Sequence, residues 1–264
     1  MDNMVEINNL DYLDFNKFCL YIKKNSFTSI VGSIKSGKTT LVKIMSGIIP
    51  TNNVCKCNEE VLNYDNVYNY LKNIGVVFGV TKNSFIYDTV KEELEYSLIN
   101  LGFSKNIINR KIKKILSDFN LLQIYDKEIN SLNVSIKQIL LFIIALLHEP
   151  KVLLIDDAFI LMNNKDKKVI FNYLMKLKNN NDLTIVYFTT RLDDIVNCDY
   201  LYLLDSFCIK KSGSPLVLLE DDQTFYESGL EVPFMIDLSI KLKMYGLIDK
   251  MYLDMEELVD MIWK

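Results

Sequence analysis

The sequence predicts an α/β protein in which a parallel sheet is covered by helices on both faces. The prediction depends on short apolar runs bounded by glycine or polar residues, helical repeats between those runs, and a composition suited to a packed core. Of the 264 residues, 50% are hydrophobic and 24% are charged, with only 9 glycines and 4 prolines. This composition excludes disordered and low-complexity chains. Strands that alternate with helices favour a parallel sheet, because each crossover then covers one of its faces.

The first half of the chain begins with strands and continues with helices. Apolar and polar groups alternate over short stretches before residue 33, which indicates three strands, at 5–10, 18–24 and 27–32. Residues 63–71 are ambiguous, and 74–78 form a short branched run typical of a buried strand. From 88 to 123 the apolar residues recur at three- and four-residue spacing, which predicts helices.

The second half predicts two more strands and two more helices. An apolar helix at 132–147 stops before Pro150, and a strand follows at 152–155. An amphipathic helix at 165–177 precedes a strand at 183–188. After Gly213 the chain becomes acidic and then helical. We therefore expect a domain at 1–219, with a helical insert at about 88–147, and a small helical tail at 220–264.

Residues 32–39 match the pattern G-x-x-x-x-G-K-[ST], between a predicted strand and a predicted helix. In that context the glycines let the backbone bend around a phosphate at the N-terminus of the helix, where the helix dipole favours anions. Lys38 supplies positive charge to the β- and γ-phosphates, and the Thr39 hydroxyl is a ligand for Mg²⁺. The residues predicted to bind ATP here are Gly32, Ser33, Ile34, Lys35, Ser36, Gly37, Lys38, Thr39 and Thr40.

Asp156 ends the predicted strand at 152–155. A carboxylate in that position lies beside a phosphate loop and holds the magnesium shell, so we predict Thr39 and Asp156 as the metal ligands. The charge of the chain points away from nucleic acid, because 30 Lys and Arg against 34 Asp and Glu leave a net charge of −4. The longest apolar run, 139–147, is far shorter than the roughly 20 residues of a membrane-spanning helix.

The order of these parts resembles the ATP-binding subunits of ABC transporters, and more narrowly the A subunit of energy-coupling factor (ECF) transporters. The broad resemblance depends on the phosphate loop, the helical insert, the stretch 132–138 and the acidic strand after it. The narrower one depends on 78–93 and, in the tail, on 227–234 and 256–259. It covers about residues 5–258. It implies a P-loop NTPase fold of the ABC ATPase type, with an antiparallel β subdomain beside the parallel core sheet.

The chain departs from the family pattern in the parts that serve hydrolysis. The signature L-S-G-G-Q lies at 132–136, or at 134–138 in a second register, and both glycines are replaced in either case. A branched side chain obstructs the close approach that bare backbone N–H groups need. The glutamine that the family has after Phe78 is Gly79. The signature loop of this chain is therefore expected to be impaired.

The resemblance also assigns two catalytic positions, and both carry other residues. The glutamate that polarises the attacking water is Asp157, and the histidine that contacts the γ-phosphate is Thr190. Asp157 is one methylene shorter than glutamate, which retracts its carboxylate by about 1.5 Å. Threonine cannot carry positive charge. We expect intact ATP binding with impaired hydrolysis. The family also implies an aromatic platform for adenine, which we assign to Tyr12. Phe15 is the alternative because the register of this turn is not fixed, and Tyr12 could instead be a core residue.

The resemblance implies a subunit that couples ATP to the uptake of a vitamin or metal ion. Its implied partners are a second ATP-binding subunit in a hetero-pair, an integral membrane scaffold and a substrate-binding subunit, at the cytoplasmic face of the membrane. Two other readings stay open: a regulatory cassette that binds ATP but drives nothing, and a soluble cassette factor acting on DNA or ribosomes. Against the last, Gly79 and Leu132 are too close in sequence for a long coiled-coil insertion between them.

Overall fold

The computed structural model describes residues 2–51, 53–180, 183–195, 198–252 and 255–263. Its strands are β1 (Asn3–Tyr12), β2 (Phe15–Lys23), β3 (Phe27–Val31), β4 (Cys55–Cys57), β5 (Glu60–Val61), β6 (Ile74–Phe78), β7 (Val152–Asp156), β8 (Thr184–Thr189), β9 (Tyr200–Asp205) and β10 (Cys208–Gly213). Its α-helices are α1 (Lys38–Met45), α2 (Val67–Lys72), α3 (Val90–Ile99), α4 (Lys105–Asp118), α5 (Val134–Leu146), α6 (Asn164–Asn179), α7 (Pro215–Leu219), α8 (Asp222–Glu227), α9 (Phe234–Met244) and α10 (Met255–Ile262).

The core is a sheet with the strand order β10-β9-β3-β8-β7-β6. Neighbours from β9 to β6 are parallel, and β10 is antiparallel at one edge. The predicted parallel sheet is therefore confirmed. Because parallel strands end at the same edge of a sheet, the loops that follow β3, β7 and β8 meet there. This edge holds the predicted phosphate loop and both predicted catalytic residues.

A second, antiparallel sheet has the order β2-β1-β4-β5 and forms the expected β subdomain. Helix α1 packs between the two sheets, because its apolar side chains Leu41, Val42, Ile44 and Met45 are fully buried among residues of both. The ambiguous segment before β6 contains the short helix α2. Burial on two sides holds α1 rigidly at the end of β3, where the phosphate loop begins.

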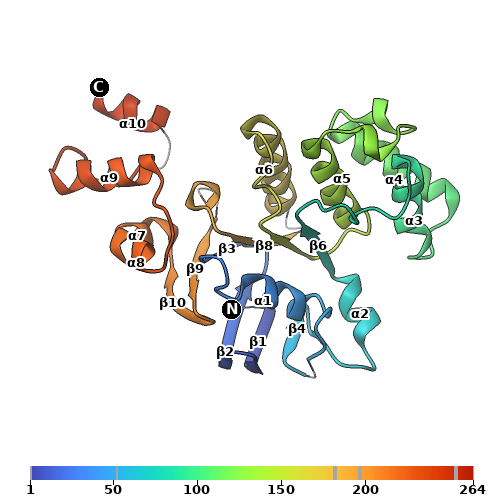
Figure 1. Cartoon of the computed structure of the whole chain (residues 1–264), viewed down its shortest axis with the longest axis horizontal. Coiled ribbons are helices and arrows are strands. Elements are labelled where there is room, and N and C mark those ends of the chain that lie inside the picture. The colour runs from blue at the N-terminus through green and yellow to red at the C-terminus, as the bar shows by residue number, and fades with distance from the viewer. Residues whose placement is uncertain (1, 52, 181–182, 196–197, 253–254, 264) are drawn as a thin grey trace.

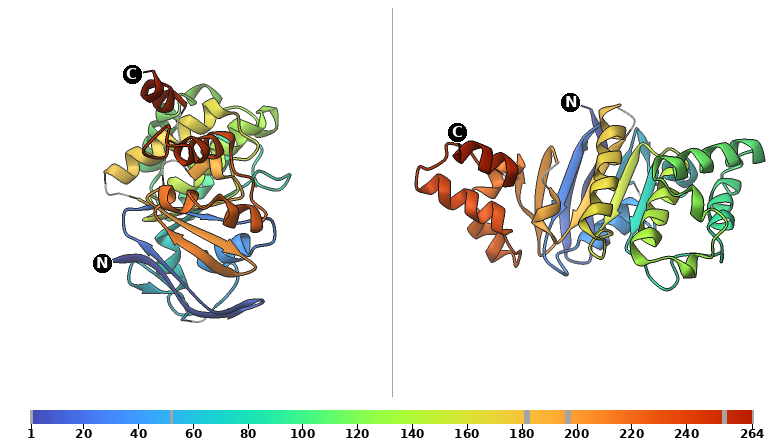
Figure 2. Two further views of the ribbon diagram at one scale, coloured as in Figure 1. Left: turned by 90° about the vertical axis from the view of Figure 1, so that its left-hand side faces the viewer. Right: turned by 90° about the horizontal axis from the view of Figure 1, so that it is seen from above.

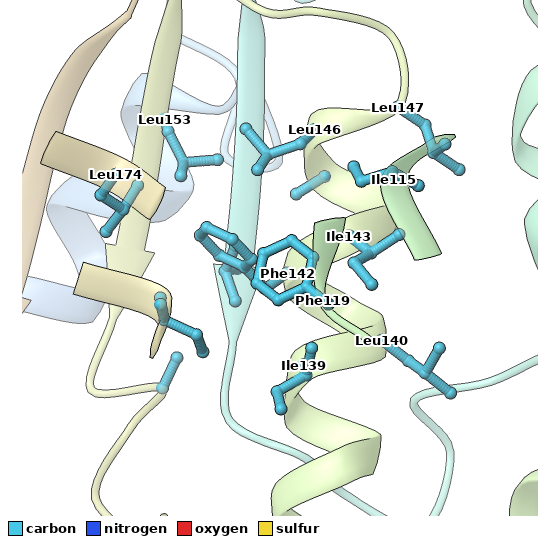
Figure 3. Packing of buried hydrophobic residues seen from close by; sticks show 14 of the residues in the cluster. Ile115, Phe119, Ile139, Leu140, Phe142, Ile143, Leu146, Leu147, Leu153 and Leu174 are labelled. Atoms are coloured by element: carbon cyan, nitrogen blue, oxygen red, sulfur yellow. The ribbon is translucent and has the colours of Figure 1, made fainter. Parts of the chain in front are cut away.

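Helices α3 to α6 share a single hydrophobic cluster with the core sheet. The helices predicted at 88–123 and 132–147 are α3, α4 and α5. Phe142 of α5 lies at the centre of this cluster beside Phe119 and Ile139 (Figure 3). In Figures 1 and 2 the helices α3 to α5 lie beyond one end of the core sheet, and the tail helices α7 to α10 lie beyond the other.

The tail is joined to the edge of the core sheet by a third hydrophobic cluster. Phe225, Leu230 and Ile236 of the tail are buried together with Leu201 and Leu203 of β9. The tail therefore shares a core with the first domain, and the boundary at 219/220 stays a prediction. Among the helices within the described ranges, none has the length and apolar character needed to span a membrane.

Candidate functional site

The loop between β3 and α1 is too tight for side chains at its glycines. A Cβ on Gly32 would lie 2.3 Å from the carbonyl oxygen of Leu204, and Gly37 has a φ of +108°. The N–H of Leu41 donates to the carbonyl oxygen of Gly37 at 2.9 Å, so the first turn of α1 begins directly at the loop. The N-terminus of a helix that starts in this way favours an anion.

Lys35 adds strain and charge to the same loop. Its side chain is exposed and its φ is +68°. A non-glycine residue in this left-handed region costs of order 1–3 kcal/mol and persists where the surroundings hold it in place. The loop is thus a rigid, positively charged turn.

Lys38 is folded into this loop. Its side-chain Nζ donates to the carbonyl oxygens of Gly32 at 2.7 Å and Ser33 at 3.0 Å, and the residue is only 4% exposed. Burial lowers the pKa of Lys38, while the carboxylates of Asp157 and Asp156 work against that shift. The ammonium group therefore lies inside the loop, close to both acids.

Asp156 presents a buried oxygen that has no protein partner. The residue is 7% exposed, and among the described residues its Oδ1 has no hydrogen-bond partner. Burial raises its pKa, whereas a hydrogen bond from Thr39 and the charge of Lys38 lower it. In the described part of the chain no group of three or more His, Cys, Asp or Glu residues is suited to hold a metal alone. One carboxylate and one hydroxyl suit Mg²⁺, which takes few protein ligands together with phosphate oxygens.

The two predicted catalytic residues lie next to each other. Oδ1 of Asp157 accepts from the N–H of Thr190 at 2.9 Å, and its distance to the Thr190 hydroxyl is 3.5 Å. Asp157 has a φ of +45°, and its N–H donates to the carbonyl oxygen of Phe188 at 2.9 Å. The carboxylate at the end of β7 is therefore engaged with the backbone that follows β8.

A family model described as ABC transporter matches residues 15–160. The chain belongs to the ABC transporter family. It is 27% identical to the energy-coupling factor transporter ATP-binding protein EcfA of Pediococcus pentosaceus, over 97% of this chain and 95% of that protein. It is 28% identical to EcfA1 of Staphylococcus saprophyticus, over 90% of this chain and 91% of that protein.

Solved structures show the same fold. CbiO1 from Clostridium perfringens, described as part of the ABC transporter complex CbiONQ, superposes with a TM-score of 0.76 at 19% identity, covering 90% of this chain and 99% of that chain. The resemblance to ECF ATP-binding subunits and the expected ABC ATPase fold are both confirmed. Membership of this ATPase family implies that the cassette binds ATP.

In this ABC cassette the signature segment ends at the N-terminus of α5. Asn133 caps the helix, because its side-chain oxygen accepts from the N–H of Ile136 at 2.9 Å. Val134 follows and is 47% exposed. The Oγ of Ser135 lies 3.5 Å from Nδ2 of Asn163, in the loop before α6. Val134 stands at a glycine position of the family signature only in the register 132–136, and the impairment of the signature stays a prediction.

Gln138 is expected to belong to the signature only in the register 134–138, and its contacts with the loop after β6 were not predicted. It is 2% exposed; its Oε1 accepts from the N–H of Val80 at 2.9 Å, and its Nε2 donates to the carbonyl oxygen of Phe78 at 3.0 Å. The side-chain amide therefore spans Gly79 and ties the helical insert to the end of β6. A polar side chain directly before the apolar run 139–147 is the signal that marks it in the sequence.

The first hairpin of the cassette carries both candidates for the adenine platform. Tyr12 and Phe15 are paired across β1 and β2, and Tyr12 is partly buried. Phe15 is only 2% exposed, because it packs edge-on against Phe18 and against Phe207 of the turn between β9 and β10. Sequence reasoning missed Phe207, which lies far from the hairpin in the chain.

The tail of the cassette approaches the phosphate loop directly. A cleft of about 410 Å³ is lined by Ser33 and Ile34 of the loop, by residues 190–193, and by residues 229–231 of the tail. A Cβ on Gly229 would lie 3.5 Å from the Cβ of Ser33. The C-terminal end of α8 is therefore in contact range of the nucleotide loop.

Proposed function

We propose that this chain is the ATP-binding subunit of an ECF-type importer and binds MgATP at residues 32–40. The observation that carries the proposal is Oδ1 of Asp156, which is buried near Lys38 and Thr39 and has no hydrogen-bond partner among the residues that the structure describes. Thr39 and Asp156 would hold Mg²⁺, which neutralises charge on the phosphates when it is bound. The two relatives named as ECF ATP-binding proteins match nearly the whole chain, which supports the ECF assignment. The cargo class we propose is a vitamin or metal ion, and the location is the cytoplasmic face of the membrane.

We further propose that the site of this chain hydrolyses ATP poorly. Oδ1 of Asp157 accepts from the N–H of Thr190, so one of its two carboxylate oxygens is already turned toward the backbone and fewer acceptor sites remain for a water molecule. Because Asp157 is shorter than glutamate, its carboxylate also starts about 1.5 Å further from the phosphates. A misplacement of about 1 Å in a catalytic group costs on the order of 10²-fold in rate.

Restoring both groups is expected to increase turnover. In the complex with its partner subunits, the double variant Asp157→Glu/Thr190→His should release phosphate on the order of 10²-fold faster than the wild type, and either single variant should gain less. The reason is that one group orients water while the other contacts the γ-phosphate. Phosphate release from MgATP measures the effect.

The Lys38→Ala variant is the negative control for phosphate release, because it removes the proposed contact with the phosphates of ATP. Rapid hydrolysis by the purified wild-type chain alone would contradict the proposal of an impaired site. If Lys38→Ala changed neither the ATP turnover of the complex nor its uptake of cargo, the regulatory function would be favoured instead. In that case this chain binds nucleotide but does not drive transport.

The proposed partner is a second, intact ATP-binding subunit. Family resemblance implies that each ATP lies between the phosphate loop of one subunit and the signature of the other. This chain combines a complete phosphate loop with a signature whose glycines are replaced, so a homodimer would repeat the defect at both sites. A hetero-pair places an intact signature opposite Lys38.

Helix α10 carries an exposed apolar stripe that fits such a partner. Met255, Val259 and Ile262 are 45%, 42% and 53% exposed, and their spacing puts them on one face of the helix. Shortening the tail would uncover buried residues of β9, so substitution is the better test. Val259→Glu/Ile262→Glu is expected to reduce co-purification of the second ATP-binding subunit without changing ATP affinity. Unchanged recovery would remove α10 from the interface.

The loop before α3 supplies a surface for the membrane scaffold. Ile86 is 71% exposed and Tyr87 38% exposed, yet their N–H groups donate to Oε2 of Glu93 at 2.9 Å and 2.8 Å. Glu93 is itself only 6% exposed. A buried carboxylate thus fixes the backbone that carries two exposed apolar side chains, which reduces the backbone entropy lost when a partner binds.

A further inference from the structure

The turn between β9 and β10 contacts the phosphate loop, although it lies far from the first hairpin in the sequence. The N–H of Phe207 donates to the carbonyl oxygen of Ser36 at 3.0 Å. A Cβ built on Gly37 would lie 2.8 Å from the ring of Phe15 and 2.9 Å from the ring of Phe207. The start of α1 is therefore covered by two aromatic rings from two different turns.

Phe207 holds this place at an energetic cost. Both central residues of its turn are left-handed, with φ of +49° at Ser206 and +62° at Phe207. Glycine, asparagine or aspartate normally occupies such positions, because a bulky side chain at positive φ is strained. Strain of this kind is concentrated at ligand-binding sites, where the function of the residue outweighs its conformational cost.

The two rings differ in what they offer a ligand. Phe15 is 2% exposed and meets Phe207 at a centroid distance of 4.9 Å and an interplanar angle of 84°. Phe207 is only partly buried. Phe15 therefore packs against Phe207 from the protein interior. Of the two rings, Phe207 is the one with exposed surface on which a planar group can stack.

We infer that Phe207 stacks on the base of the nucleotide whose phosphates lie at residues 32–39, an inference that rests on the ATP binding proposed above. An aromatic ring attracts any base through its π-face and forms no hydrogen bonds to the base edge. The contact therefore separates nucleotides from bare polyphosphates but distinguishes adenine from guanine only weakly. This adds a third element to the site, beside the phosphate loop and the first hairpin.

Calorimetric titration of the full chain with ATP and with inorganic tripolyphosphate tests the inference, because tripolyphosphate has no base. Phe207→Ala is expected to weaken ATP binding by about 5- to 150-fold, the range for one base–aromatic stack, and to leave tripolyphosphate binding unchanged. GTP is expected to lose as much as ATP.

Phe207→Trp provides a second variant that retains the stack. It should bind ATP as the wild type does, and its fluorescence should be quenched by ATP but not by tripolyphosphate. The measurement uses a Trp263→Phe background, since Trp263 is the one tryptophan of the sequence.

The outcomes separate this inference from the function on which it rests. Equal weakening of ATP and tripolyphosphate by Phe207→Ala would mean that the turn only supports the loop, and unchanged ATP binding would remove Phe207 from the site. If Tyr12→Ala weakened ATP binding and Phe207→Ala did not, the base would be assigned to the first hairpin instead. If the wild type bound neither ligand, the proposed ATP site itself would be rejected, and the inference with it.

Discussion

Replacing Lys38 with alanine is expected to weaken ATP binding by the isolated chain by about 10- to 150-fold, the value of a hydrogen bond to a charged group. The ammonium group is 4% exposed and donates to two carbonyl oxygens of the loop. Phosphate oxygens are charged acceptors and form stronger bonds than these neutral ones. Calorimetric titration with MgATP measures the loss.

Lys72→Ala is the matched control, because it removes the same charge from the exposed end of α2. It should leave ATP affinity unchanged. Equal ATP affinity in Lys38→Ala and the wild type would show that the nucleotide does not bind at this loop.

The second large effect concerns stability. Phe142→Ala is expected to lower the free energy of unfolding by about 3–5 kcal/mol, out of the 5–15 kcal/mol typical of a native domain. Phe142 is fully buried, and its ring centroid lies 5.8 Å from that of Phe119 and 6.2 Å from that of Phe159 (Figure 3). The lost ring leaves a cavity between α4, α5 and α6 that these neighbours cannot close. Urea titration followed by circular dichroism measures the change.

Phe234→Ala is the control, because Phe234 is 68% exposed at the start of α9 and its truncation opens no cavity. Its free energy of unfolding should stay close to that of the wild type. If Phe142→Ala were as stable as Phe234→Ala, the cluster on this face of the sheet would not support the fold.

Much of the fold could be predicted because its signals are local. The strands β3, β6, β7 and β8 are short apolar runs, and α5 contains a long one. The length and spacing of hydrophobic residues alone therefore predict where these elements lie. Helix α2 stayed ambiguous because a short helix of mixed polarity has too few turns to show a period. The candidate site followed from the same local order: a strand, the loop at 32–39 and a helix.

Other features of the site depend on contacts that no local pattern encodes. The amide of Gln138 meets Phe78 and Val80 only because α5 packs across the end of β6. A polar residue before an apolar run marks a position of interest, but it does not name its partner. The role of Gln138 therefore emerged only from the packing.

The sequence by itself determined the phosphate loop and the acid that ends β7, because each depends on neighbours in the chain and on the chemistry of single side chains. The catalytic roles of the positions of Asp157 and Thr190 come from the family resemblance and stay predictions. The tertiary structure decided how these parts meet. Pairing of β7 with β8 brings Asp157 to the backbone of Thr190, and pairing of β3 with β9 brings Phe207 to the loop. Strand order is set by the burial of whole faces of a sheet, a property of the entire chain, so no single segment could reveal it.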